Sequence, residues 1–312
     1  MPAAIPAAEA AQSPPVTQAP AGTTRPLPGR PQSAVFDPST GLLAILVSGP
    51  TDTAPTSLVL LGDQQTSERT IALPGAASGL TGDGAGTAYL SARGGYYAAD
   101  LATGRVTTVG VRGADGVGFS AITRRADGTV LLGTADGTLY AMKPQATDPS
   151  RIPVHAHVDS LAAQGNTVAV LDRGQTSITT VEADGVVGQS LRAGLGATTI
   201  AADSAGRLLV SDTRGGQLLV FGVDPLILRQ AYPVADSPCG VAGSRGLAWV
   251  SQTSANTVIG YDLSTGIPVE KVRYPSVRQP NALAFDDAAG TLFVLSGDGE
   301  GVQVIEHAAD PR

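Results

Sequence analysis

Short apolar runs alternate with polar, glycine-containing turns along the last third of the chain, and this alternation repeats. Each repeat opens with an apolar run, passes a glycine turn into a hydrophobic strand, and crosses a second polar turn into another strand. The aligned repeats are Thr198–Ser237, Pro238–Gln279 and Pro280–Arg312, with turn glycines at Gly206, Gly246 and Gly290. Short apolar runs bounded by turn residues predict strands. A period of about 40 residues with several strands in each period predicts a β-propeller.

The same pattern extends backwards with weaker similarity and divides the chain into seven units. The units are Ser33–Ser78, Gly79–Val117, Gly118–Val158, Asp159–Ala197, Thr198–Ser237, Pro238–Gln279 and Pro280–Arg312. No window carries a sustained helical period with capping residues, so we expect almost no helix. The predicted fold is all-β, a seven-bladed β-propeller that occupies residues 22–312 as a single domain.

The seventh unit is too short for a complete blade, because the chain ends a few residues after its third strand. The N-terminal stretch Thr23–Gly29 resembles Thr70–Gly75, the outer strand of the first unit. We therefore expect Thr23–Leu27 to complete the last blade, which removes an open sheet edge. Pro26 and Pro28 are compatible with an edge strand only.

Residues 1–21 are rich in alanine and proline and carry almost no charge. Repeated proline breaks helices and sheets, so we expect a disordered tether. The segment has neither a basic n-region nor an apolar h-region and does not read as a signal peptide. It suits the mature start of an anchored, exported protein; an ordinary frayed terminus is the alternative.

Composition narrows the classes of function. The chain has 312 residues, 42% of them hydrophobic and 15% charged, with a net charge of −7. No basic stripe is present, which argues against nucleic-acid binding. Cys239 is the only cysteine, so neither an intrachain disulfide nor a multi-cysteine metal site can form. We expect no cofactor.

Aspartates recur in the turns and are predicted to shape them. They are Asp37, Asp83, Asp127, Asp203 and Asp286, each followed closely by glycine. Asp side chains accept hydrogen bonds from nearby backbone N–H groups, and glycine accepts a positive φ. We therefore interpret these carboxylates as turn-formers rather than catalytic groups.

Alignment of the units places seven residues at the same level, before the inner strands. The predicted ring is Gln32, Ser78, Phe119, Asp159, Thr198, Cys239 and Asn281. Loops and strand starts of a propeller converge at the mouth of its central channel. The hypothesis is that this ring binds a small polar ligand or a loop of a partner protein. The alternative is that these residues pack the ring, cap turns or hold water.

Three further side chains are candidates for chemistry. His155 and His157 share one face if the segment is extended, and Asp159 is close to them. Zinc usually takes ligands from more than one segment, so we favour an outer strand with solvated histidines and no metal. A nucleophilic Cys239 would need a base beside it; a small buried thiol is the alternative we favour. Trp249 lies in a predicted strand, and we expect it to pack between blades.

The sixth unit carries a family resemblance. Trp249–Gln252 ends one strand, Asn256–Val258 begins the next, and Asp262 ends it. This sequence resembles the repeat of YVTN/NHL-like bacterial surface β-propellers. With this repeat, its Ala/Pro-rich leader and its arginine-rich composition, the chain is similar to actinobacterial cell-envelope propeller lipoproteins. The lipidated cysteine that such proteins carry at their mature N-terminus is not present in this chain. The resemblance implies an extracytoplasmic protein of the cell envelope that meets the membrane only through such an anchor.

The predicted function is a non-catalytic binding or scaffolding propeller, monomeric, with an unknown protein or a small polar ligand at the channel mouth and no nucleic-acid partner. The alternative is a metal-dependent lactonase or hydrolase with its site in the channel. In that case Asp159, Asn281 and Gln32 would supply oxygen ligands.

Overall fold

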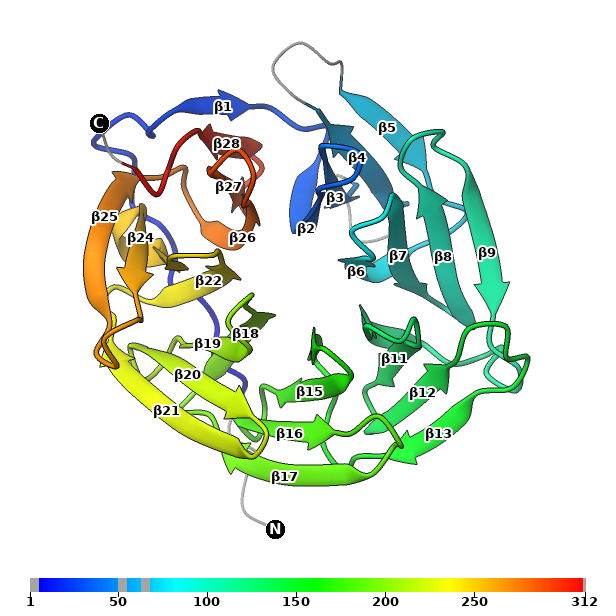
Figure 1. Ribbon diagram of the computed structural model, residues 1–312. Helices are drawn as coiled ribbons and strands as arrows, with labels where there is room; N and C mark the ends of the chain where they lie inside the picture. Colours follow the sequence, from blue (N-terminus) through cyan, green and yellow to red (C-terminus); the bar gives the residue numbers. More distant parts are fainter. Residues whose placement is uncertain (1–5, 50–54, 63–67, 311–312) are drawn as a thin grey trace.

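The computed structural model describes residues 6–49, 55–62 and 68–310. Seven four-stranded antiparallel sheets, the blades, surround one axis (Figure 1). The predicted all-β, seven-bladed β-propeller is confirmed. The one helix within the described ranges is the 3-10 turn η1 (Thr253–Ala255). Accordingly, the described part of the chain contains no helix of the length and apolarity needed to cross a membrane.

Each blade is built from consecutive strands, except the last. Blade 1 holds β2 (Arg30–Asp37), β3 (Leu42–Ser48), β4 (Ser57–Leu61) and β5 (Arg69–Ala72); blade 2 holds β6 (Ala77–Gly82), β7 (Thr87–Ala92), β8 (Gly95–Asp100) and β9 (Val106–Gly110). Blade 3 holds β10 (Phe119–Arg124), β11 (Val130–Thr134), β12 (Thr138–Met142) and β13 (Ser150–Pro153); blade 4 holds β14 (Ser160–Gln164), β15 (Thr167–Asp172), β16 (Ser177–Val181) and β17 (Val187–Arg192). Blade 5 holds β18 (Ala197–Ala202), β19 (Arg207–Asp212), β20 (Gln217–Val223) and β21 (Leu226–Pro233); blade 6 holds β22 (Pro238–Gly243), β23 (Ala248–Gln252), β24 (Thr257–Asp262) and β25 (Val269–Pro275). Blade 7 holds β26 (Pro280–Asp286), β27 (Thr291–Ser296), β28 (Val302–Ile305) and the N-terminal strand β1 (Thr23–Arg25).

The second and third strands of each blade form most of the core. In β11 and β23 every residue is buried, because these strands are covered by neighbouring blades on both faces. The fourth strands lie at the rim and are mostly exposed, as in β17 and β25. This difference explains why continuous apolar runs mark the second and third strands in the sequence, whereas the outer strands are hard to recognise.

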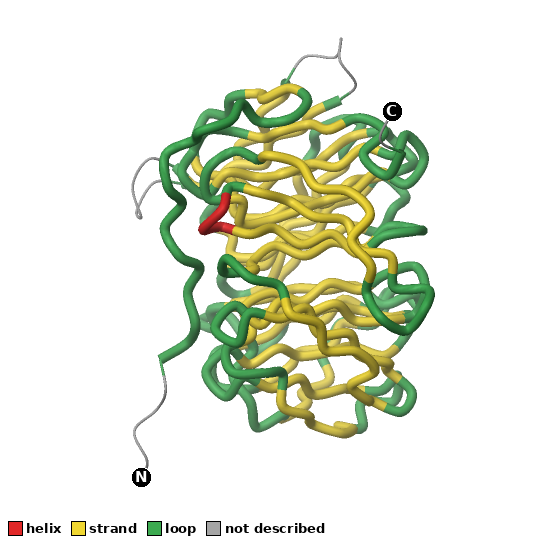
Figure 2. Tube along the Cα trace, turned by 90° about the vertical axis from the view of Figure 1, so that its left-hand side faces the viewer, coloured by secondary structure: helices red, strands yellow, loops and turns green. Residues whose placement is uncertain are grey.

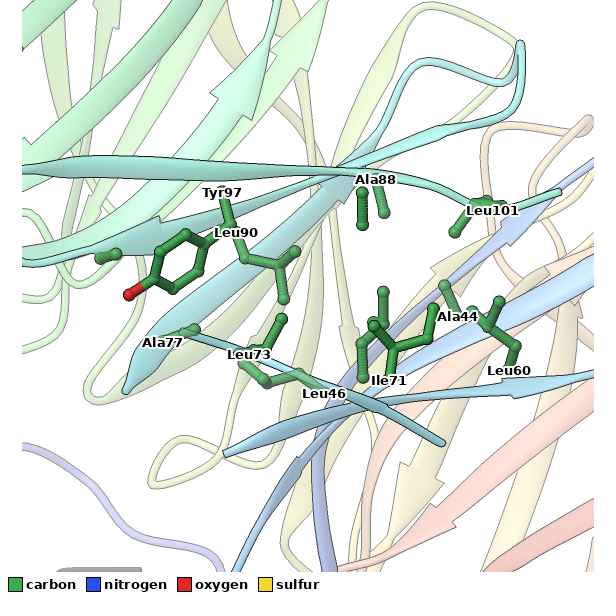
Figure 3. Close-up of a cluster of buried hydrophobic side chains, with 13 residues drawn as sticks. Ala44, Leu46, Leu60, Ile71, Leu73, Ala77, Ala88, Leu90, Tyr97 and Leu101 are labelled. Carbon is green, nitrogen blue, oxygen red and sulfur yellow. The ribbon is translucent and has the colours of Figure 1, made fainter. Parts of the chain in front are cut away.

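Hydrophobic side chains fill the space between neighbouring blades. Between blades 1 and 2, Leu46 and Ile71 face Leu90 and Tyr97 (Figure 3). Burial of a leucine-sized side chain contributes about 1.5–3 kcal/mol. Trp249 is fully buried and stacks on Phe285 of blade 7, with ring centroids 5.7 Å apart. The packing of Trp249 between blades is thus confirmed.

The turn aspartates act as the sequence predicts. In all five turns the Oδ1 atom accepts backbone N–H groups of the residues that follow: Asp37, Asp83, Asp127, Asp203 and Asp286. Asp37 also joins two blades, because its Oδ2 accepts the N–H of Gly86 in blade 2 at 2.9 Å. These carboxylates therefore stabilise turns and one inter-blade contact.

The N-terminal strand lies in the last blade. β1 pairs antiparallel with β28, with Thr24 opposite Gln303. The strand expected over Thr23–Leu27 ends at Arg25, since the next residue is Pro26, which has no N–H to donate. Strands from the two ends of the described chain therefore share one sheet.

The segment before β1 follows a defined path instead of the disordered course expected for residues 1–21. Residues 6–21 run along one face of the ring, as the side view in Figure 2 shows. Ala8 and Ser13 are only 4% and 5% exposed. Residues 1–5 lie outside the described part of the chain. The segment has no apolar pattern of its own, and its contacts come from loops of blades 4 to 7.

Candidate functional site

The strand nearest the axis in each blade, here called the first strand, begins with an irregularity. In six blades the pairing between the first and second strands skips one or two residues. The skipped residues are Gln32, Ser78, Ser120, Thr198, Asn281 and the pair Cys239–Gly240. A β-bulge re-aims the side chain of the extra residue. Five of the seven predicted ring residues are therefore equivalent by backbone geometry.

The first strands contact one another in succession around the ring, from β2 to β26 and back to β2. Their bulged starts consequently face the same end of the channel, here called the channel mouth. Gln32 and Ser78 are exposed at this level, and Thr198 and Asn281 are partly exposed. The structure thus brings polar side chains from several blades to one opening.

Phe119 does not share this geometry. It pairs with Thr134, is 2% exposed, and packs edge-to-face on Tyr140 with ring centroids 5.2 Å apart. The bulged residue of blade 3 is Ser120, whose Oγ donates to Val158 O, in the connection to blade 4, at 2.6 Å. The prediction of Phe119 as the ring residue of blade 3 is therefore wrong by one position, because the sequence does not reveal where the bulge falls.

Asp159 precedes the regular first strand of blade 4. Its Oδ2 accepts the backbone N–H of Arg173 at 2.8 Å, and its Oδ1 lies 3.3 Å from Nδ1 of His157. Both carboxylate oxygens are engaged within this blade. Asp159 therefore orients the turn that carries Arg173.

Hydroxyl groups link neighbouring blades behind the mouth. The Oγ of Ser211 donates to Cys239 O, and the Oγ of Ser251 donates to Pro280 O. Thr198 shares a hydrogen bond with Thr213, which in turn donates to Pro238 O. Thr198 and Cys239 consequently belong to a polar network that ties blade 5 to blade 6. Asn281 differs, because its buried Oδ1 has no hydrogen-bond partner.

Cys239 is a protonated thiol rather than a nucleophile. Its side chain is 8% exposed, and its Sγ lies 3.8 Å from Asn281 O. Burial raises the pKa of Cys239 to about 11, against the opposing effect of the Arg173 charge. At neutral pH the sulfur keeps its proton, as a buried thiol would.

The two histidines do not lie in an outer strand, so that prediction is wrong. β13 ends at Pro153, and His155 and His157 follow in the loop that leads to β14. His155 has a φ of 54°, which breaks the extended geometry assumed for a shared face. Within residues 6–49, 55–62 and 68–310, no three His, Cys, Asp or Glu side chains gather as a metal site would require.

Arg173 is a residue that sequence reasoning missed. It lies in the turn between β15 and β16, and its Nη2 donates to Ala8 O of the N-terminal segment at 2.6 Å. Its Nε is buried without a hydrogen-bond partner. The turn sequence Asp-Arg-Gly-Gln resembles any other polar turn of the chain, so no sequence signal marks this arginine.

Beyond the mouth lies a cavity of about 420 Å³. All seven first strands line it, mostly with alanine, valine, leucine and isoleucine. Arg124 is the charged residue among the described lining, and its guanidinium lies 5.8 Å from the centre of the Tyr89 ring. The side chains are therefore polar at the mouth and mostly apolar in this cavity.

Comparison with known proteins supports the fold. No protein-family model matches the chain, and no curated protein sequence matches it. Among solved structures, a streptogramin B lyase superposes with a TM-score of 0.72 at 12% identity, covering 92% of this chain and 96% of the other. A virginiamycin B lyase from Staphylococcus aureus gives 0.71 at 12% identity, with 89% and 96% covered. A chain of the mitotic checkpoint complex gives 0.74 at 11% identity, with 96% of both covered. Lyases and a chain of a checkpoint complex share this architecture with similar TM-scores, so the likeness establishes the propeller fold and not a function. The comparisons do not show the YVTN-type family, which was expected from the sequence of the sixth unit.

Proposed function

We propose that the protein is a non-catalytic binding or scaffolding propeller whose ligand, a small polar molecule or a partner's loop, binds at the channel mouth. The observation that carries this proposal is the set of bulges that turns one polar residue from each of several blades toward the same opening. Gln32 and Ser78 are free to reach a ligand there. The unpartnered Oδ1 of Asn281 supplies an acceptor whose burial is costly unless it is bonded.

The hydrolase alternative has weaker support from the geometry. It needs Asp159, Asn281 and Gln32 to bind one metal ion. Asp159 is engaged by Arg173 and His157 within its own blade. Gln32 and Asn281 belong to blades 1 and 7, which lie across the channel from blade 4 in Figure 1. The arrangement favours hydrogen bonding to a ligand over metal-assisted hydrolysis.

The test is a binding screen with a matched set of variants. A panel of sugars, amino acids and dicarboxylates is screened by saturation-transfer NMR, and each hit is titrated by calorimetry. We expect Asn281→Ala and Gln32→Ala to weaken binding of a true ligand about 10-fold, as the loss of a hydrogen bond predicts. The exposed Gln18→Ala serves as the control. Unchanged affinity in both ring variants would refute the site. Calcium-dependent lactone hydrolysis that disappears in Asn281→Ala would support the enzyme instead.

We further propose that the protein acts as a monomer outside the cytoplasm, in the cell envelope. The resemblance of Trp249–Asp262 to surface-propeller repeats supports this location. Fractionation of the producing cells with an antiserum against the propeller tests it, together with light scattering on the purified protein. Recovery from the cytosol, or a mass of twice 31.3 kDa, would contradict the respective claim.

A further inference from the structure

The main chain of residues 6–14 is held by side chains from separate loops. Five carbonyl groups each accept a hydrogen bond from a different side chain. Arg214 Nη2 donates to Pro6 O at 2.7 Å, Arg173 Nη2 to Ala8 O at 2.6 Å, Gln279 Nε2 to Ala11 O at 2.9 Å, Arg278 Nη2 to Ser13 O at 3.4 Å, and Asn256 Nδ2 to Pro14 O at 2.9 Å.

The amide groups of the segment are recognised as well. Ala11 N donates to Ser237 Oγ at 3.0 Å, and Ser13 N donates to Gln279 Oε1 at 2.9 Å. Gln279 therefore binds the segment through both atoms of its side-chain amide. The Oγ of Ser13 also donates to Thr253 O at 2.7 Å. Five side-chain donors and two side-chain acceptors of the surface thus bind the backbone of this short stretch.

Only two side chains of this stretch are buried, and both are small. Ala8 enters a notch above Gly196, where a Cβ added at Gly196 would lie 2.7 Å from the Ala8 Cβ. Ser13 fills the second notch, beside Thr253 and Gln279. Glu9, Gln12 and the prolines project outward. The surface therefore selects two small residues separated by four others, of which Glu9 and Gln12 are exposed and Ala10 and Ala11 are partly buried. Its remaining hydrogen bonds are to the peptide backbone.

We propose that this surface, here called the peptide groove, is a binding site for extended Ala/Pro-rich peptides, and that residues 6–14 occupy it as an intramolecular ligand. The peptide groove consists of Arg173, Gly196, Arg214, Ser237, Asn256, Arg278 and Gln279. Proline is tolerated at Pro14 because the hydrogen bond from Asn256 to this residue is accepted by its carbonyl oxygen and requires no N–H. A partner segment with the same spacing of small residues replaces the internal one.

This inference goes beyond the channel-mouth proposal, because the groove uses other side chains, several of which lie just before the bulged strand starts. Residues 6–14 compete with any free peptide for the peptide groove. Because they are tethered to the same chain, their effective concentration at the groove is on the order of millimolar. A free peptide consequently binds the wild-type protein weakly and binds well only when the internal segment is released.

The experiment uses the full chain and a labelled peptide. The double variant Ala8→Leu/Ser13→Pro removes the fit above Gly196 and the Ser13 N–H, and should release the segment. A fluorescein-labelled peptide of residues 6–17, PAAEAAQSPPVT, is titrated by fluorescence anisotropy. We expect it to bind the double variant at least 10-fold more tightly than the wild type. A scrambled peptide of the same composition should bind at least 10-fold more weakly.

Two additional substitutions in the released background locate the peptide. Gln279→Ala should weaken binding at least 10-fold, whereas Gln32→Ala at the channel mouth should leave it unchanged. Unaltered Trp249 emission confirms that the ring is intact. Equal binding to wild type and double variant, equal binding of the scrambled peptide, or loss of binding in Gln32→Ala would overturn the proposal.

A second measurement does not depend on the double variant folding. In the single variant Gln279→Ala, amide hydrogen exchange of residues 8–13 should accelerate at least 10-fold relative to the wild type, while exchange in β11 stays the same. Unchanged protection of the segment would equally overturn the proposal.

Discussion

Ser13 and Gln279 are 266 positions apart in the chain and hold each other by reciprocal hydrogen bonds. The N–H of Ser13 donates to Gln279 Oε1 at 2.9 Å, and the N–H of Gln279 donates to Ser13 Oγ at 2.7 Å. Both residues are buried. Because Gln279 immediately precedes β26, this pair fixes the N-terminal segment to the start of blade 7. The N-terminal region is therefore attached to blade 7 at two places, by this pair and by the pairing of β1 with β28.

Ser13→Ala should reduce the free energy of unfolding by about 1–3 kcal/mol, because it leaves the buried N–H of Gln279 without an acceptor. Guanidinium denaturation followed by the emission of Trp249, which is fully buried, measures this. Ser150→Ala, at an exposed position of β13, is the control and should stay within about 0.5 kcal/mol of wild type. Equal losses in the two variants would contradict the assigned role of Ser13.

Gln303→Leu should destabilise the protein by about 3 kcal/mol. The Gln303 side chain is fully buried; its Oε1 accepts the N–H of Val277, and its Nε2 donates to Ala21 O and Pro275 O. Leucine keeps the volume and removes these bonds. The same denaturation measurement applies, with the exposed Gln18→Leu as control. If both substitutions cost under about 0.5 kcal/mol, the amide is not needed at the blade 6–7 junction.

Asp37→Asn should reduce the free energy of unfolding by about 2 kcal/mol at pH 7, because the neutral amide turns an NH₂ group toward one of the N–H donors that the carboxylate accepts. Burial alone would raise the pKa of Asp37, but hydrogen bonds from Ser39, Gly86 and Thr40 outweigh it and lower the pKa below 3.8. The charged carboxylate therefore stabilises the fold above pH 3.8, and this contribution disappears as the pH falls through the lowered native pKa. Denaturation curves from pH 7 to pH 2 should show the wild type and Asp37→Asn converging in acid. Asp115→Asn is the exposed control, and parallel profiles for wild type and Asp37→Asn would refute the linkage.

Cys239 should make stability fall in alkaline solution. Its pKa rises from 9.0 in the unfolded chain to about 11 in the folded protein. Because the unfolded thiol ionises first, the stabilisation is complete below pH 9 and is lost as the pH rises toward 11, by about 3 kcal/mol in total. The comparison is wild type against Cys239→Ala under reducing conditions from pH 7 to pH 11. A difference between the two that does not change with pH would disprove the burial of the thiol.

The fold could be predicted because each of the first six blades is a contiguous piece of sequence. Residues such as Arg207–Asp212 and Thr257–Asp262 carry their strand pattern locally, and the glycine and aspartate turns between them are equally local. The place of the N-terminal strand followed from its likeness to Thr70–Gly75. None of these inferences required knowledge of which residues meet across the ring.

The candidate site was only partly predictable, because its details depend on backbone register and on loops of different blades. Ser120 rather than Phe119 occupies the ring position, since a bulge shifts the pairing by one residue. Arg173, Arg214 and Gln279 converge on residues 6–14 only after the blades close. An Ala/Pro-rich segment has the same composition whether it is free or bound, so the sequence predicted a tether there.

The path of the N-terminal segment determines how the protein responds to mechanical force. A pull on residue 6 would load the contacts of Arg214, Arg173 and Gln279 one after another, in the order of their partners Pro6, Ala8 and Ala11. The pairing of Thr23–Arg25 with β28 is stretched only after the segment has peeled away. Residues 6–22 can thus reach an end-to-end length of about 55 Å while the ring stays closed. The segment would therefore lengthen under tension before any load reaches the sheet of blade 7.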